Sequence, residues 1–109
     1  MNYNVKFIKV FVRQAKRLTR KYVSLKKELL ELVEQLKENP KLGTPIGRSC
    51  YKIRIAVASK GKGRSSGARI ITNFLTLYNT VYLISIYDKS EQETLSDKEL
   101  DELLRHIPL

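Results

Sequence analysis

Residues 50–74 read CYKIRIAVASKGKGRSSGARIITNF, and this stretch decides the fold. Both of its ends are rich in β-branched and aromatic residues, which predicts two strands joined by a loop. In the first strand, apolar residues alternate with Lys52 and Arg54, so both basic side chains project from the face opposite the core. The loop contains glycines, serines and basic residues but no acid. The stretch is therefore a hairpin of two strands with a long cationic loop.

Outside the hairpin, the spacing of apolar residues changes from period two to the helical period and back. Phe11, Ala15, Leu18 and Tyr22 share one helical face, and Asn39-Pro40 ends a second helix. Ser96 and Glu99 form a capping box at the start of a final helix. The predicted elements are strand 3–7, helices 9–22 and 24–39, loop 41–50, strands 51–58, 68–77 and 81–87, and a helix from 96.

This order predicts a single α+β domain over residues 1–109. We expect a mostly antiparallel, twisted sheet, packed by the two N-terminal helices, with a short C-terminal helix.

The charge of the chain is unbalanced and segregated. Lys and Arg number 21 against 11 Asp and Glu, giving a net charge of +10, and no acid occurs between residues 39 and 87. No fold requires such an excess, and it attracts polyanions, so nucleic acid is the first partner to consider. A membrane surface or an acidic protein is the second.

Several other classes are excluded or disfavoured. Cys50 is the only cysteine, so no intrachain disulfide forms and a reducing compartment fits. Cys50 and His106 do not assemble a metal site or a Cys-His nucleophile, so we expect no metal and no cofactor. The N-terminus lacks the apolar segment of a signal peptide, and no apolar run is long enough to span a bilayer. We therefore expect a cytoplasmic protein with no membrane partner.

The loop does not match a phosphate-binding motif. Ser66 and Ala68 stand where a Walker motif that starts at Gly61 or Gly63 needs its second glycine, and Ser66 also breaks the dinucleotide pattern. Two interpretations remain, a solvated hairpin loop and a nucleic-acid contact. In the second, six cations converge on one patch that binds a phosphodiester backbone: Lys52, Arg54, Lys60, Lys62, Arg64 and Arg69.

Residues 50–74, followed by VYLISIYDKSEQETLSDKEL at 81–100, resemble the RelE/ParE superfamily of toxins from type II toxin-antitoxin modules. The loop and the GARII segment are most similar to the RelE/HigB-like branch. The resemblance implies a ribosome-dependent endoribonuclease that cleaves messenger RNA by metal-independent 2′-hydroxyl attack. It also implies a cognate antitoxin. We expect the protein to be a monomer when the antitoxin is absent.

The resemblance also implies site residues. Lys52, Arg54 and Arg69 match basic positions of the family's catalytic site, and Lys89 falls near another. The family's C-terminal catalytic tyrosine falls near Leu95, so Tyr87 is the nearest candidate for that role. The alternative for Tyr87 is a core residue at the end of its strand. Lys60, Lys62 and Arg64 are then RNA-binding residues on the loop.

The first helix is one candidate antitoxin dock, through Arg13, Arg17 and Arg20. Plain solvation of these arginines is the equal alternative. Two other functions remain open for the whole chain, a ParE-like inhibitor of DNA gyrase and a non-catalytic nucleic-acid-binding module. The shared fold allows each of them, so fold alone does not decide the function.

Overall fold

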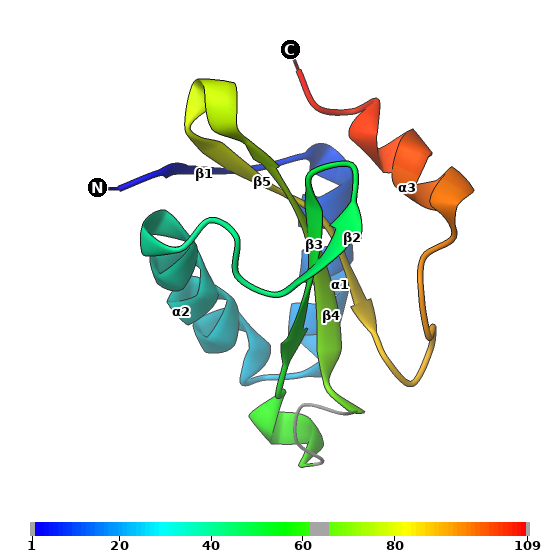
Figure 1. Cartoon of the computed structure of the whole chain (residues 1–109). Coiled ribbons are helices and arrows are strands. Elements are labelled where there is room, and N and C mark those ends of the chain that lie inside the picture. The colour runs from blue at the N-terminus through cyan, green and yellow to red at the C-terminus, as the bar shows by residue number, and fades with distance from the viewer. Residues whose placement is uncertain (1, 62–65, 109) are drawn as a thin grey trace.

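The computed structural model describes residues 2–61 and 66–108. Over these residues the chain forms one sheet of five strands in the order β1-β5-β4-β3-β2 (Figure 1). The elements are β1 (Asn4–Phe7), α1 (Lys9–Lys21), α2 (Leu25–Glu38), β2 (Thr44–Gly47), β3 (Cys50–Ile55), the 3-10 helix η1 (Ala58–Lys60), β4 (Ala68–Leu75), the 3-10 helix η3 (Thr76–Tyr78), β5 (Thr80–Asp88) and α3 (Asp97–Leu104).

The structure confirms the α+β class and the predicted order of the helices and long strands. It adds β2, which lies within the segment predicted as loop. Thr44 pairs with Lys52 and Pro45 with Tyr51 along the outer edge of β3. Proline is tolerated on an edge strand, where its missing N–H faces solvent. The turn residues around this short strand hid its pairing from sequence analysis.

The sheet is mostly antiparallel, as expected. β3 pairs with β4 and β4 with β5 in antiparallel register. β1 runs parallel to β5, with Val5 opposite Val81. A parallel pair needs a long connection, and the chain between β1 and β5 contains α1, α2 and the whole hairpin.

The helices occupy two faces of the sheet. Residues of α1 and α2 line an apolar cavity together with Leu83 of β5. Leu100 of α3 instead shares a cavity with Ile71 of β4. Thr72, the neighbour of Ile71, is the register partner of Leu83, so Ile71 and Leu83 point to opposite faces. Figure 1 accordingly shows α2 and α3 on opposite sides of the strands.

The capping box of the last helix is confirmed. The Glu99 backbone N–H donates to Ser96 Oγ at 3.1 Å, and the Ser96 N–H donates to Glu99 Oε1 at 3.0 Å. These bonds fix where the chain turns into α3. No helix in the described part of the chain is long and apolar enough to cross a bilayer.

Candidate nucleic-acid interface and active site

The candidate site lies on a row of side chains that crosses three neighbouring strands. Arg54 of β3 is opposite Arg69 of β4, and Arg69 is opposite Tyr87 of β5. Directly opposed residues of antiparallel strands point to the same face, so these three side chains gather on the face that carries α3. Lys52 lies one pleat further along β3 on that face, opposite Ile71. Two long-range pairings therefore build the site.

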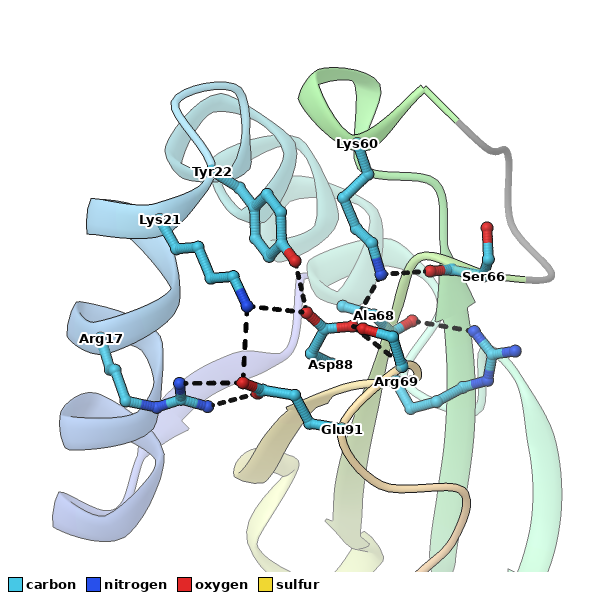
Figure 2. A network of polar contacts seen from close by, with 10 residues as sticks. Arg17, Lys21, Tyr22, Lys60, Ser66, Ala68, Arg69, Asp88 and Glu91 are labelled. Atoms are coloured by element: carbon cyan, nitrogen blue, oxygen red, sulfur yellow. Dashed lines mark hydrogen bonds and ion pairs between the residues drawn. The ribbon is translucent and has the colours of Figure 1, made fainter.

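The members of this row differ in burial. Arg54 is exposed and Lys52 is half-buried, as expected for side chains that point away from the core. Arg69 is only 3% exposed, so it is a buried member of the predicted patch and not a surface cation. Its guanidinium donates to the Ala68 carbonyl at 3.3 Å and points away from Asp88 in Figure 2. β4 lies between β3 and β5 in the sheet, and this central position accounts for the burial of Arg69.

Two effects disfavour the charged form of Arg69 and one favours it. Burial lowers the pKa of Arg69, the positive charge of Arg54 lowers it further, and Tyr87 acts in the opposite direction. A buried cation next to a second cation is stabilised by an anion that enters between them. The pair of arginines therefore favours a phosphate group on this face.

Tyr87 contributes a buried hydroxyl to the same row. The residue is 5% exposed, and its Oη has no hydrogen-bond partner among the residues that the structure describes. Burial raises the pKa of Tyr87, Arg69 opposes this effect and Glu99 adds to it. The hydroxyl therefore keeps its proton at neutral pH and is available to donate a hydrogen bond.

Two residues after β5, Lys89 and Leu95, fall near positions of the family's catalytic site, and their surroundings differ. The Lys89 backbone N–H donates to the Gly67 carbonyl at 3.1 Å, and its ammonium lies 3.6 Å from Glu93. Leu95 lines a cavity of about 90 Å³ together with Lys52 and Leu100. An apolar side chain thus stands beside Lys52 where the resemblance places a tyrosine.

The loop residues divide into two groups. Lys62 and Arg64, predicted to bind RNA, lie outside the described residues. Lys60, predicted to do the same, is instead engaged with the protein: its ammonium lies 2.6 Å from Asp88 Oδ1 and 2.5 Å from the Ser66 carbonyl oxygen. Its side chain is 9% exposed. The ion pair neutralises the charge that an RNA contact requires, so we assign Lys60 a role within the protein.

The three arginines predicted to dock an antitoxin lie on α1. Arg13 and Arg20 are exposed. Arg17 is also exposed, but its Nη2 donates to Glu91 Oε1 at 2.7 Å. Arg13 and Arg20 are therefore the stronger docking candidates.

Asp88 was not among the residues predicted from the sequence, although a signal existed. It is the first acid after the acid-free stretch 39–87, and it directly follows an apolar strand. Its side chain is 1% exposed and accepts a hydrogen bond from Tyr22 Oη at 2.5 Å. Tyr22 was predicted only as part of the apolar stripe of the first helix. A lone acid at the end of a buried strand needs such donors.

Comparison with known proteins identifies similar chains. A family model described as the RelE toxin of the RelE/RelB toxin-antitoxin system matches residues 8–107. A free-state mutant of the E. coli toxin RelE superposes with a TM-score of 0.66 at 19% identity, covering 99% of this chain and 100% of that one.

Two toxin-antitoxin complexes have a similar fold. The intact E. coli RelBE complex matches with a TM-score of 0.61 at 21% identity, covering 79% of this chain and 95% of that one. The RelBE2 complex of Mycobacterium tuberculosis has a TM-score of 0.61 at 17% identity, with 81% and 99% covered. At these identities the structures establish a common fold.

Proposed function

The chain belongs to the RelE toxin family, and from this premise we propose that it is a ribosome-dependent endoribonuclease that cuts messenger RNA and arrests translation. The observation that supports the proposal is the row of Arg54, Arg69 and Tyr87, with Lys52 beside it. Two adjacent cations and a protonated hydroxyl on one sheet face suit a phosphodiester whose charge increases during reaction.

The proposed reaction needs no metal. The ribose 2′-oxygen attacks the adjacent phosphorus, the bond from phosphorus to the 5′-oxygen breaks, and a cyclic 2′,3′-phosphate forms. Lys52, Arg54 and Arg69 stabilise the extra negative charge on the phosphorane, and each such donor contributes about 3 kcal/mol when preorganised. Tyr87 gives its proton to the departing 5′-oxygen, and the 2′-hydroxyl proton passes to solvent water.

The composition of the site supports dependence on the ribosome. Residues 39–87 contain no histidine, aspartate or glutamate, which are the usual groups for general base catalysis. Strands that carry no such base depend on accurate placement of the substrate, because alignment of the reacting atoms alone lowers a barrier substantially. The ribosome supplies that placement by holding the message.

A cognate antitoxin is the second proposed partner. Two solved relatives are toxin-antitoxin complexes from E. coli and M. tuberculosis. In this chain α1 offers the exposed cations Arg13 and Arg20, and Val12, the residue before Arg13, is 41% exposed. An acidic, amphipathic segment fits such a surface.

Single-turnover cleavage of a message on programmed ribosomes tests the catalytic row. Arg54→Ala and Lys52→Ala should each slow cleavage by about a hundredfold, because each removes a contact to the charged phosphorane. Arg69 is buried, so both Arg69→Ala and the charge-preserving Arg69→Lys are needed, with melting temperatures recorded for each. Lys41→Ala, which removes an exposed charge on a different segment, is the matched control.

Two outcomes would contradict this assignment. If the Lys52 and Arg54 variants cleave as fast as the control, the row is not the catalytic site. If messages remain intact while the protein still arrests growth, a target other than RNA is correct, and DNA supercoiling by gyrase is then the assay to run.

A further inference from the structure

Asp88 is the centre of a buried polar network that the proposed reaction does not use. Its carboxylate accepts hydrogen bonds from Tyr22 Oη at 2.5 Å, Lys60 Nζ at 2.6 Å and Ser90 Oγ at 2.6 Å. Burial alone would raise the pKa of Asp88, but the bonds from Lys60, Ser90 and Tyr22 outweigh it and hold the pKa well below its usual range. The buried carboxylate is therefore charged and paired.

Lys60 connects this carboxylate to both strands of the hairpin. It ends η1, the first element after β3, and its ammonium also donates to the carbonyl of Ser66, two residues before β4 begins. Figure 2 shows the ammonium between Ser66 and Asp88. A single charged group thus fixes the exit of β3 and the entry of β4 to the end of β5.

The entry of β4 is held by two further contacts. The Lys89 N–H donates to the Gly67 carbonyl at 3.1 Å. A Cβ atom on Gly67 would lie 2.0 Å from the Ile55 carbonyl oxygen, so the two backbones approach more closely there than any side chain allows. Small shifts of Ser66 and Gly67 therefore pass directly into Ala68 and Arg69.

The network and the catalytic row occupy neighbouring rungs on opposite faces. Asp88 is the register partner of Ala68, and Tyr87 is the partner of Arg69. Consecutive strand residues point to opposite faces, so the Lys60 charge lies on the Tyr22 side while Arg69 points the other way (Figure 2). Lys60 therefore acts on Arg69 through the backbone.

We propose that Lys60 and Asp88 are positioning residues that fix the start of β4, and with it Arg69, in the geometry that RNA cleavage requires. The inference rests on the proposed function only for its kinetic part, since the fixing of β4 is a property of the protein alone. Buried ion pairs add little net stability relative to apolar substitutes, and their best use is to specify one arrangement.

The test uses Lys60→Met, Asp88→Asn, the double variant and the conservative Lys60→Arg. Lys27→Met, which removes an exposed charge from α2, is the control. Three quantities are measured: amide hydrogen exchange at residues 66–71, the single-turnover cleavage rate at saturating ribosome, and the dependence of binding on salt. Exchange at 80–84 in the first half of β5 serves as the internal reference.

For a positioning pair, Lys60→Met should speed exchange at 66–71 selectively and reduce the saturating cleavage rate at least about tenfold, while the salt dependence of binding stays unchanged. Lys60→Arg, compared with Lys60→Met, should recover part of the protection from exchange at 66–71 and part of the cleavage rate. The double variant should exchange no faster and cleave no more slowly than the more impaired single variant, because each single change leaves one buried charge unpaired.

Other results overturn the proposal. If Lys60→Met keeps the saturating rate but weakens binding with a shallower salt dependence, Lys60 contacts RNA directly. If exchange at 66–71 is unchanged, the pair does not fix β4. A wild-type protein that cleaves no message refutes the proposed function, and the exchange measurement then still decides whether the pair positions β4.

Discussion

Arg69 and Tyr87, two members of the proposed catalytic row, are buried side chains. Arg69 is 3% exposed and Tyr87 is 5% exposed, so both are shielded from most of the solvent. A buried cation or hydroxyl interacts more strongly with an incoming phosphate than an exposed one, because less water competes. The same burial makes the stability of each Arg69 variant a necessary control.

Tyr87→Phe should separate catalysis from folding. The change removes a buried hydroxyl that has no partner in the described part of the chain, so the free energy of unfolding should stay the same or increase slightly. Loss of a proton donor should slow cleavage by about a hundredfold or more, with little change in substrate binding. Single-turnover rates and urea unfolding measure the two effects.

Tyr78→Phe is the matched control, because Tyr78 is 56% exposed and lies in the β4–β5 turn. Equal cleavage rates for the Tyr87 and Tyr78 variants would remove Tyr87 from the mechanism.

Asp88 should make stability depend on pH in the acid range. Its pKa is depressed in the folded protein, so its stabilisation is complete above the unfolded pKa of about 3.9 and is lost as pH falls further. The melting temperature of Asp88→Asn should therefore lie below that of the wild type at about pH 6, and the gap should narrow toward about pH 2.

Glu93→Gln, at a carboxylate that is 88% exposed, should show no such gap at either pH. A gap for Asp88→Asn that stays constant over this range would mean that the charge of Asp88 contributes nothing.

At the scale of elements, the hairpin of β3 and β4 contains one unusually close backbone contact beyond its paired residues. Gly67 adjoins Ile55 at the point where β3 ends and β4 begins, and no other residue type fits there. On the other side of the loop, η1 is tied to the junction of α1 and α2: Ser59 N–H donates to Ser24 Oγ at 3.0 Å and Ala58 N–H to Glu28 Oε2 at 2.8 Å. These contacts hold the two ends of the cationic loop.

Gly67→Ala should destabilise the protein strongly. The added Cβ would lie 2.0 Å from a backbone oxygen, so the strands must separate, at a cost of about 3 kcal/mol. Gly61→Ala is the control, because that glycine has a φ of 74° but open space around its Cβ position, and strain alone costs about 1 kcal/mol. Urea unfolding compares the two, and an equal loss would show that the close contact is unimportant.

Charge reversal on α1 tests the proposed antitoxin surface. Arg13→Glu together with Arg20→Glu should weaken the complex with the cognate antitoxin at least about tenfold, since like charges then face each other. Calorimetric titration measures the affinity, with Lys41→Glu as the control for net charge. Unchanged affinity for the α1 variant would place the antitoxin on another surface.

The whole molecule carries its charge asymmetrically. The net charge of +10 arises from long acid-free stretches. Of the acids, Glu91 pairs with Arg17 of α1, and Asp88 pairs with Lys60 of η1. The remaining uncompensated charge favours association with a polyanion and makes that association salt-dependent. A ribosome presents such a surface.

Expression without an antitoxin should stop growth. The arrest should disappear in Arg54→Ala at an equal amount of soluble protein, and primer extension should find breaks in translated messages only. Blocking translation before induction should prevent the breaks, because the message must be held on a ribosome. Arrest with intact messages and inhibited supercoiling would instead support a ParE-like inhibitor.

Local periodicity alone determined the helices, the long strands, the face of β3 that carries Lys52 and Arg54, and the capping box at Ser96. These features depend on neighbours within a few residues, so the sequence contains them directly. The excess of basic residues likewise follows from composition without reference to a fold.

Only the tertiary structure decided which of the basic residues lie together. The register of three strands brought Arg54, Arg69 and Tyr87 into one row and paired β2 with β3. It also buried Lys60 against Asp88, although its sequence context matches that of a solvated loop cation. Strand register and the burial of a charge depend on contacts between distant segments, and no local pattern in the sequence encodes them.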